Sequence, residues 1–224
     1  MTSRRTSREY ELELQQLRRK LVVMAERVQR MTLNAVRSVV ERNSQLAADV
    51  IIEDRDVNRE EIEIDELCLL ILARRQPMAS DLRFVATAMK MVTDLERVGD
   101  LSVSIAERAI SLNGAPVLRS YEDIQKMADI TSEMLNITIT AFLEGDARLA
   151  ETVIERDDEV DDLYHRLANE LTDNMTKHSD TIRRSIDVRA VAKNLERMAD
   201  HTTNIAEMVI YMIRGKDVRH MGKQ

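Results

Sequence analysis

The chain has 224 residues, of which 44% are hydrophobic and 33% charged, and its formal net charge is −7 at pH 7. This acidic balance argues against a nucleic-acid-binding protein. The sequence has no apolar run of roughly 20 residues and no signal peptide. We therefore expect a cytoplasmic protein without direct membrane insertion. With only two prolines, five glycines and one cysteine, the composition favours an all-α fold without an internal disulfide framework.

Helical periodicity predicts three helices in the first half of the chain, at about residues 8–43, 45–73 and 78–112. Apolar residues recur there at steps of three and four, as on one face of an amphipathic helix. The second helix ends before Pro77, because the residue preceding a proline is disfavoured in the helical region. The third ends at Asn113-Gly114-Ala115-Pro116, a sequence typical of helix C-termini.

The same periodicity predicts three helices in the second half, at about residues 117–143, 147–175 and 180–213. Gly145 and Gly215 follow two of them, as expected of helix C-caps. We therefore divide the chain into a first three-helix repeat, a second three-helix repeat and a flexible polar tail, at residues 1–114, 115–215 and 216–224.

An internal duplication supports this division. Residues 95–107 and 195–207 lie 100 positions apart and share seven of thirteen residues. Upstream, the apolar pattern of residues 46–57 recurs at residues 149–160. The fold class that follows is all-α, with six helices forming a tandem duplication of two antiparallel three-helix bundles.

Each repeat carries two pairs of polar side chains, one pair on each of two antiparallel helices. Residues four apart on a helix point the same way, and both pairs lie about 20 residues from the connecting turn. We therefore expect them to meet at one level of an outer face, where their carboxylates repel unless a cation sits among them. The pairs are Asp54 with Asn58 and Glu96 with Asp100 in the first repeat, and Asp157 with Asp161 and Glu196 with Asp200 in the second.

An oxygen-rich set of this kind suits a hard cation such as Mg, Mn or Fe, or a carboxylate-bound Zn. Gly99 lies inside the helix beside two of these acids, where glycine costs about 1 kcal/mol relative to alanine. Its presence indicates room for an ion or a close partner helix. The alternative interpretation is a solvated acidic face whose partners are arginines such as Arg97, Arg156 and Arg197.

Two motifs, at residues 74–83 (RRQPMASDLR) and 94–100 (DLERVGD), closely resemble the signature of the PhoU family, the accessory and regulatory proteins of phosphate-specific transport. The resemblance covers essentially the whole chain. It implies a negative regulator of phosphate uptake and of the phosphate-starvation response. The resemblance implies an adaptor between the ATPase subunit of a phosphate ABC transporter and the sensor histidine kinase of the phosphate two-component system. Contact with these partners would place the protein at the inner membrane as a peripheral protein.

The resemblance also implies metal clusters on the bundle surface. The ligands that it implies are Asp54, Glu96 and Asp100 in the first repeat, and Asp157, Asp161, Glu196 and Asp200 in the second. Asn58 departs from the acidic pattern, so we expect the first site to be weaker or to hold fewer ions.

Two other interpretations stay open. A ferritin-like di-metal enzyme needs paired Glu-x-x-His motifs facing the bundle core, whereas this chain offers Asp162-x-x-His165 and Asp217-x-x-His220. Because the sequence also lacks a nucleophile–base arrangement and a phosphate-binding glycine loop, we expect no catalysis. A metal-free helical scaffold would instead use its acidic faces for solubility alone.

The third predicted helix carries a second apolar stripe, which has no counterpart of equal strength in the sixth. A helix that is apolar on two sides needs two partners. We expect the stripe to pack against the other repeat or against a second subunit, as in a homodimer. Its members are Leu82, Val85, Met89, Val92, Val103 and Ile110.

Overall fold

The computed structural model describes residues 2–119 and 121–215, with side chains from residue 8 onward. Within those ranges the regular structure is helical throughout, and no helix is long and apolar enough to cross a membrane. The elements are α1 (Thr2–Val40), α2 (Ser44–Arg75), α3 (Ala79–Asn113), α4 (Glu122–Glu144), α5 (Ala147–Lys177), the 3₁₀ turn η1 (Ser179–Thr181) and α6 (Ile182–Arg214). The predicted tail at 216–224, with Asp217 and His220, lies outside the described residues.

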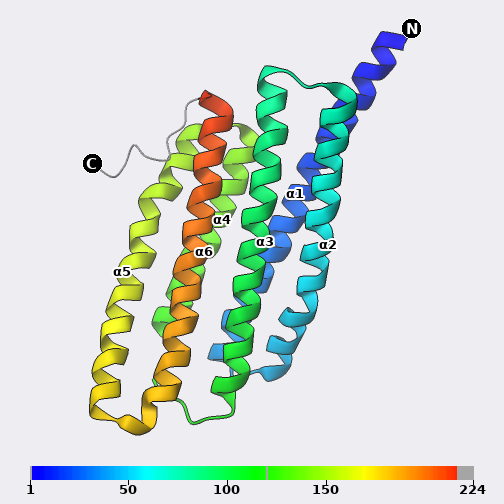
Figure 1. The fold of residues 1–224 in the computed structure, drawn as a ribbon. Helices are drawn as coiled ribbons and strands as arrows, with labels where there is room; N and C mark the ends of the chain where they lie inside the picture. The colour runs from blue at the N-terminus through cyan, green and yellow to red at the C-terminus, as the bar shows by residue number, and fades with distance from the viewer. Residues whose placement is uncertain (1, 120, 216–224) are drawn as a thin grey trace.

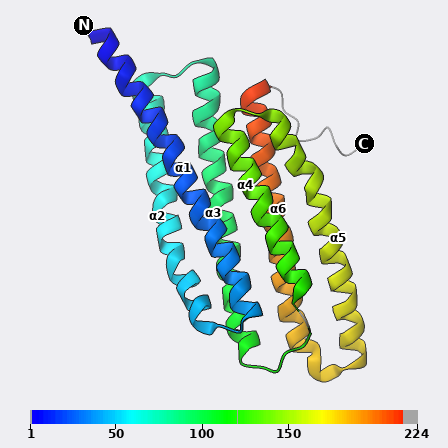
Figure 2. The same cartoon turned by 180° about the vertical axis from the view of Figure 1, so that it is seen from behind.

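Two three-helix bundles lie side by side (Figure 1). Each helix of α1–α3 runs antiparallel to the next in one bundle, and α4–α6 repeat this arrangement in the other. The bundles meet where α3 packs on α6 and, as the reverse view in Figure 2 shows, where α1 packs on α4. The all-α fold, with six helices in two tandem bundles, is thus confirmed. The division of the repeats at residue 114 stays a prediction.

The helix ends agree with the sequence expectation to within about three residues, except at the starts of α1 and α4. Helix α1 was expected from about residue 8, but it begins at Thr2. Helix α4 was expected from residue 117, but it begins at Glu122. In the linker, Arg42 Nη2 donates to the carbonyl oxygens of Asn113 and Ala115 at 2.6 and 2.7 Å. These side-chain hydrogen bonds satisfy carbonyl groups that a continuing helix would otherwise pair, so the chain stays non-helical for longer than its periodicity indicates.

Gly145 ends α4 in the left-handed conformation, with φ at 68°, where a Cβ atom is disfavoured. We expect Gly145→Ala to lower the free energy of unfolding by about 1 kcal/mol, measured by urea denaturation. Gly114 is the matched control, because its φ is −76° and an added methyl group would lie no closer than 3.6 Å to a neighbouring atom. Gly114→Ala should change stability by less than about 0.5 kcal/mol, and equal losses at both positions would contradict this account.

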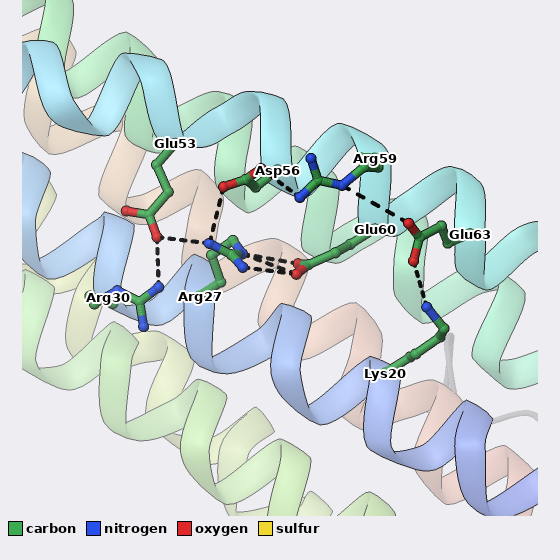
Figure 3. A network of polar contacts seen from close by, with 8 residues as sticks. All are labelled: Lys20, Arg27, Arg30, Glu53, Asp56, Arg59, Glu60 and Glu63. Carbon is green, nitrogen blue, oxygen red and sulfur yellow. Dashed lines mark hydrogen bonds and ion pairs between the residues drawn. The ribbon is translucent and has the colours of Figure 1, made fainter.

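A ladder of ion pairs holds α2 against α1 (Figure 3). Arg27 of α1 lies among three acids of α2, and its Nη2 is 3.0 Å from Glu60 Oε1. The ladder continues along both helices. Its other members are Lys20, Arg30, Glu53, Asp56, Arg59 and Glu63. Each of these acids has a basic partner, so the ladder is a structural connection between two helices.

The second apolar stripe of α3 is covered only in its middle. Val85 and Val92 are fully buried, in agreement with packing between the repeats. Leu82 and Ile110, however, are 45% and 44% exposed, so the other repeat does not cover the ends of the stripe, and their burial by a second subunit stays a prediction. These two residues lie in the first and last turns of α3, at the ends of the bundle, where fewer neighbouring helices surround a side chain.

Specific contacts join the two repeats near both ends of α3. Phe84 stacks on Phe142 of α4, with ring centroids 5.4 Å apart. Near the other end, the buried carboxylate of Asp187 on α6 accepts hydrogen bonds from Arg108 and Ser111 at 3.1 and 3.0 Å. The relative position of the repeats is therefore fixed by aromatic and polar contacts as well as by the apolar seam.

Candidate functional site

Close packing of α2 and α3 brings the predicted acids of the first repeat together. A methyl group at Gly99 would lie 3.3 Å from Val57 Cγ1 and 3.8 Å from Asp54 Oδ1. Glycine therefore lets the segment that carries Glu96 and Asp100 approach α2 at the level of Asp54. Of the two explanations for Gly99, this contact favours a closely packed partner helix.

Burial and mutual repulsion disfavour the charged forms of Asp54 and Glu96. Burial raises the pKa of Asp54, and the negative charge of Asp100 raises it further. The pKa of Glu96 is raised by burial and then by the same charge. Asn58 Nδ2 donates to Asp54 Oδ2 at 3.0 Å, whereas Asp54 Oδ1 is buried without a hydrogen-bond partner among the described residues. A buried, unpaired carboxylate oxygen is costly, and it is suited to bind a cation.

The predicted arginine partners compensate this charge only in part. Arg97 Nη1 lies 2.9 Å from Asp100 Oδ2, and its Nε lies 3.5 Å from Glu96 Oε2, but the Arg97 side chain is 55% exposed. Ion pairs of this exposed kind contribute about 0–1 kcal/mol. Arg156 is directed elsewhere, with its Nη2 2.9 Å from Glu133 Oε2. The alternative of a fully ion-paired acidic face is therefore only partly supported.

Two further acids of α2, absent from the predicted set, extend the first cluster. The pKa of Glu61 is raised by burial and then by the negative charge of Asp65. Burial also raises the pKa of Asp65, whose Oδ1 lacks a hydrogen-bond partner within the described part of the chain. The two residues follow Asp54 by seven and eleven positions, which places all three on one face of a helix. That spacing is the sequence signal that could have identified them.

The second repeat brings all four of its predicted acids together between α5 and α6. The pKa of Asp157 is raised to about 6, first by burial and then by the charges of Asp200 and Asp161. Burial and the charge of Glu196 raise the pKa of both Asp161 and Asp200. Carboxylates from the two helices thus act on one another, which agrees with their expected position at the same level.

Lys193 is the basic partner of this second cluster and is also absent from the predicted set. Its Nζ lies 2.6 Å from both carboxylate oxygens of Glu196 and donates a hydrogen bond to Oε1. The other oxygen, Oε2, is buried and has no hydrogen-bond partner within the described ranges. The signal for this pair was present in the sequence, because residues three apart are neighbours on a helix.

The remaining candidate histidines act on the second cluster through charge, since His165 opposes the rise in the pKa of Asp161 and His201 opposes that of Asp200. His201 Nδ1 lies 2.8 Å from Asp94 Oδ1, so this histidine makes a contact between α6 and α3. Asp162 and His165 are exposed on α5, whereas a ferritin-like site would require their side chains in the bundle core. Asp162 and His165 therefore do not form a ferritin-like centre.

The donor chemistry of both clusters suits a hard cation, although the side chains are not gathered around one. Among the described residues, no group of three or more His, Cys, Asp or Glu side chains is arranged to hold a metal ion. The unpartnered oxygen of Asp54 and the repulsion within each cluster are features that a bound cation would relieve. The assignment of the metal ligands stays a prediction, and binding would require side-chain rotation.

Asp157→Asn is expected to stabilise the metal-free protein by about 1 kcal/mol at pH 7.5, after allowance for solvent screening. The raised pKa of about 6 means that the charged carboxylate disfavours folding above that pH. The advantage of the variant should shrink towards pH 4, where the carboxyl group becomes neutral in the folded protein. Urea denaturation with a chelator at both pH values measures this. Asp162→Asn, exposed on the same helix, is the control, and an equal gain there would count against the repulsion.

Comparison with known proteins gives a consistent family assignment. The family model described as PhoU domain matches residues 21–109 and 124–209. The phosphate-specific transport system accessory protein PhoU homolog of Pseudomonas putida is 40% identical over 217 residues, which cover 96% of this chain and 85% of that protein. The crystal structure of PhoU from Pseudomonas aeruginosa has a TM-score of 0.89 at 37% identity and covers 92% of this chain and 100% of that one.

A second solved structure, the phosphate transport system regulatory protein PhoU from Streptococcus pneumoniae, shows the same fold at lower identity. It has a TM-score of 0.87 at 27% identity, and the match covers 93% of this chain and 99% of that one. The similarity thus includes both repeats and nearly the full length of the chains compared.

Proposed function

This chain belongs to the PhoU family, and from that premise we propose that it is an accessory protein of a phosphate-specific transport system. The observation that carries the proposal is the similarity to a protein of that name over 96% of this chain, at 40% identity. Relatives are named as accessory or regulatory proteins, which favours a regulatory role without catalysis.

The regulatory role that we propose is negative control of phosphate uptake and of the phosphate-starvation response. In it, the protein is an adaptor between the ATPase subunit of the phosphate ABC transporter and the sensor histidine kinase. It works in the cytoplasm, is peripheral to the inner membrane through these partners, and forms a homodimer. The two similar bundles support an adaptor, since a duplicated fold presents two related surfaces.

The proposal includes a cation at each acidic cluster. In the first repeat it would be held by Asp54, Glu96 and Asp100, and in the second by Asp157, Asp161, Glu196 and Asp200. An Fe, Mn, Mg or Zn ion bound there would neutralise repelling carboxylates and connect α2 to α3 and α5 to α6. The raised pKa values and the unpartnered oxygen of Asp54 support this part of the proposal.

Affinity purification of the tagged chain from cells grown with excess phosphate tests the adaptor role. We expect the transporter ATPase and the sensor kinase to be enriched over a tagged helical protein of unrelated function. Deletion of the gene should also switch on the starvation response at high phosphate. If neither partner is enriched and the deletion leaves the response unchanged, the proposed function is wrong.

A further inference from the structure

The outer face of α2 carries large apolar side chains that no other helix covers. α2 packs on α1 and α3 and lies at one edge of the described structure (Figure 1). The uncovered side chains are Ile52, Ile62, Leu69 and Leu70, which are 61%, 58%, 56% and 37% exposed. We propose that this face is the interface of the homodimer, in which α2 of one copy packs antiparallel on α2 of a second copy. The inference rests on the proposed homodimer and assigns its surface.

The second repeat has polar side chains at the equivalent positions. α5 aligns with α2 as Val160 aligns with Val57, and it lies at the opposite edge of the structure (Figure 1). The equivalents of the four apolar residues are Glu155, His165, Thr172 and Asp173, all of which are exposed. An edge helix of this fold therefore does not require apolar residues there. Single exposed apolar residues are ordinary, but four on one face, absent from its duplicate, indicate a surface that a partner covers.

The outer face of α2 has the spacing of a coiled-coil seam. Ile52, Ile62 and Leu69 belong to a series at positions 52, 55, 59, 62, 66 and 69, in which steps of three and four alternate. Side chains with this spacing form one stripe along a helix and interdigitate with a similar stripe of a second helix. Val57 and Ile64, which are buried in the first bundle, lie on the opposite side of α2. The stripe can therefore contact a second copy while α2 stays packed in its own bundle.

The charges within this stripe favour an antiparallel arrangement. Arg55 and Arg59 lie in its N-terminal half and Glu66 in its C-terminal half. A twofold axis near residues 60 and 61 places Arg55 opposite Glu66 of the second copy, and Ile52 opposite Leu69 of the second copy. In a parallel pair, Arg55 would face Arg55 and Glu66 would face Glu66, and like charges repel. The stripe is therefore complementary to itself in the antiparallel orientation.

Arg55 and Glu66 are available for these contacts. Both are exposed, and neither has an ion-pair partner among the described residues. Arg59 is already paired within α2, with its Nη2 2.6 Å from Asp56 Oδ1 and its Nε 4.0 Å from Glu63 Oε1. These pairs compensate the two acids that flank the stripe on its α1 side. The hydrocarbon part of Arg59 remains available to cover an apolar side chain of the second copy.

The length of the stripe indicates how strong the dimer is. From Ile52 to Leu69 it extends about 26 Å at the rise of an α-helix. One pair of helices of this length makes an interface at the small end of the specific range. Each copy also has its own buried core, so we expect a folded monomer and a dimer that dissociates on dilution.

Sedimentation equilibrium of the full chain over a range of protein concentrations tests the inference. A triple variant with Ile52→Glu, Ile62→His and Leu69→Thr introduces the residues of the second repeat, which an exposed helix of this fold accepts. It should weaken the dimer at least about tenfold, and circular dichroism checks that it is folded. The matched control is Leu82→Thr with Ile110→Thr, which removes exposed apolar residues of α3 and should leave the dimer unchanged.

An exchange of charges tests the antiparallel pairing. Arg55→Glu or Glu66→Arg alone places like charges opposite each other and should weaken the dimer about tenfold, because like-charge contacts across an interface are unfavourable. The two substitutions together recreate both pairs and should restore the affinity. A double variant as weak as the single ones would overturn this pairing.

The outcomes also separate the interface from the homodimer itself. A dimer that every α2 variant leaves intact, or that the α3 control dissociates, would overturn the inference and leave the proposed homodimer standing. A wild-type chain that stays monomeric at every concentration would overturn the homodimer as well. Neither result bears on the family assignment.

Discussion

Replacing Phe142 by alanine is expected to lower the free energy of unfolding by about 3–5 kcal/mol. Phe142 is 1% exposed and stacks on Phe84, and these are the two phenylalanines of the chain. The substitution removes apolar contacts inside each core and an aromatic contact between the repeats. Equilibrium unfolding in urea, followed by circular dichroism, gives the free energy and shows whether the two repeats still unfold together.

Leu143→Ala is the matched control for this prediction. Leu143 is the next residue of α4 and is 43% exposed, so its replacement should cost less than about 1 kcal/mol. Phe84→Ala combined with Phe142→Ala should cost less than the sum of the single variants, because the second substitution removes a contact that is already lost. Additive losses would mean that the two rings stabilise their own bundles independently.

Removal of both Glu and Asp ligands from α3 and α6 should lower the affinity for Mn²⁺ at least about hundredfold. The variant combines Glu96→Ala, Asp100→Ala, Glu196→Ala and Asp200→Ala. Each cluster then keeps acids from one helix only, which cannot surround a cation between two helices. The same variant should be at least as stable as the wild type in a chelator, since burial and repulsion disfavour the charges of Glu96 and Asp200.

The control for this variant removes the same number of charges elsewhere. Alanine replaces four exposed acids, Asp129, Glu144, Glu155 and Asp162. Binding of Mn²⁺ and the rise in melting temperature that the ion causes should be close to those of the wild type. If both quadruple variants lose binding equally, long-range attraction by the net negative charge explains it, and the specific clusters do not.

Sequence reasoning identified the acids because the duplication repeats them and helical geometry fixes their level. Asp157 and Glu196 could be placed opposite each other from their distances to one turn. Glu61 and Lys193 were also within reach of the same geometry, since each lies at helical spacing from a predicted ligand. They were missed because the motif comparison follows what the repeats share, and these positions are where the repeats differ.

Contacts between the repeats could not be derived in the same way. The bond between His201 and Asp94 and the stacking of Phe84 on Phe142 join helices that are far apart in the sequence. Periodicity indicates which face of a helix is apolar, but it does not say which helix covers that face. The late start of α4 could not be derived either, because it depends on Arg42, a side chain distant in the sequence. Arg42 donates hydrogen bonds to carbonyl oxygens of the linker before α4.

The central claim is that carboxylates at the same height on neighbouring helices form cation sites. Anomalous diffraction from crystals of the full chain grown with Mn²⁺ tests this claim most directly. The account predicts anomalous peaks between α2 and α3 beside Asp54 and Glu96, and between α5 and α6 beside Asp157 and Glu196. The claim would be contradicted if neither cluster showed a peak and the acids kept the exposure and the separation that they have without the ion.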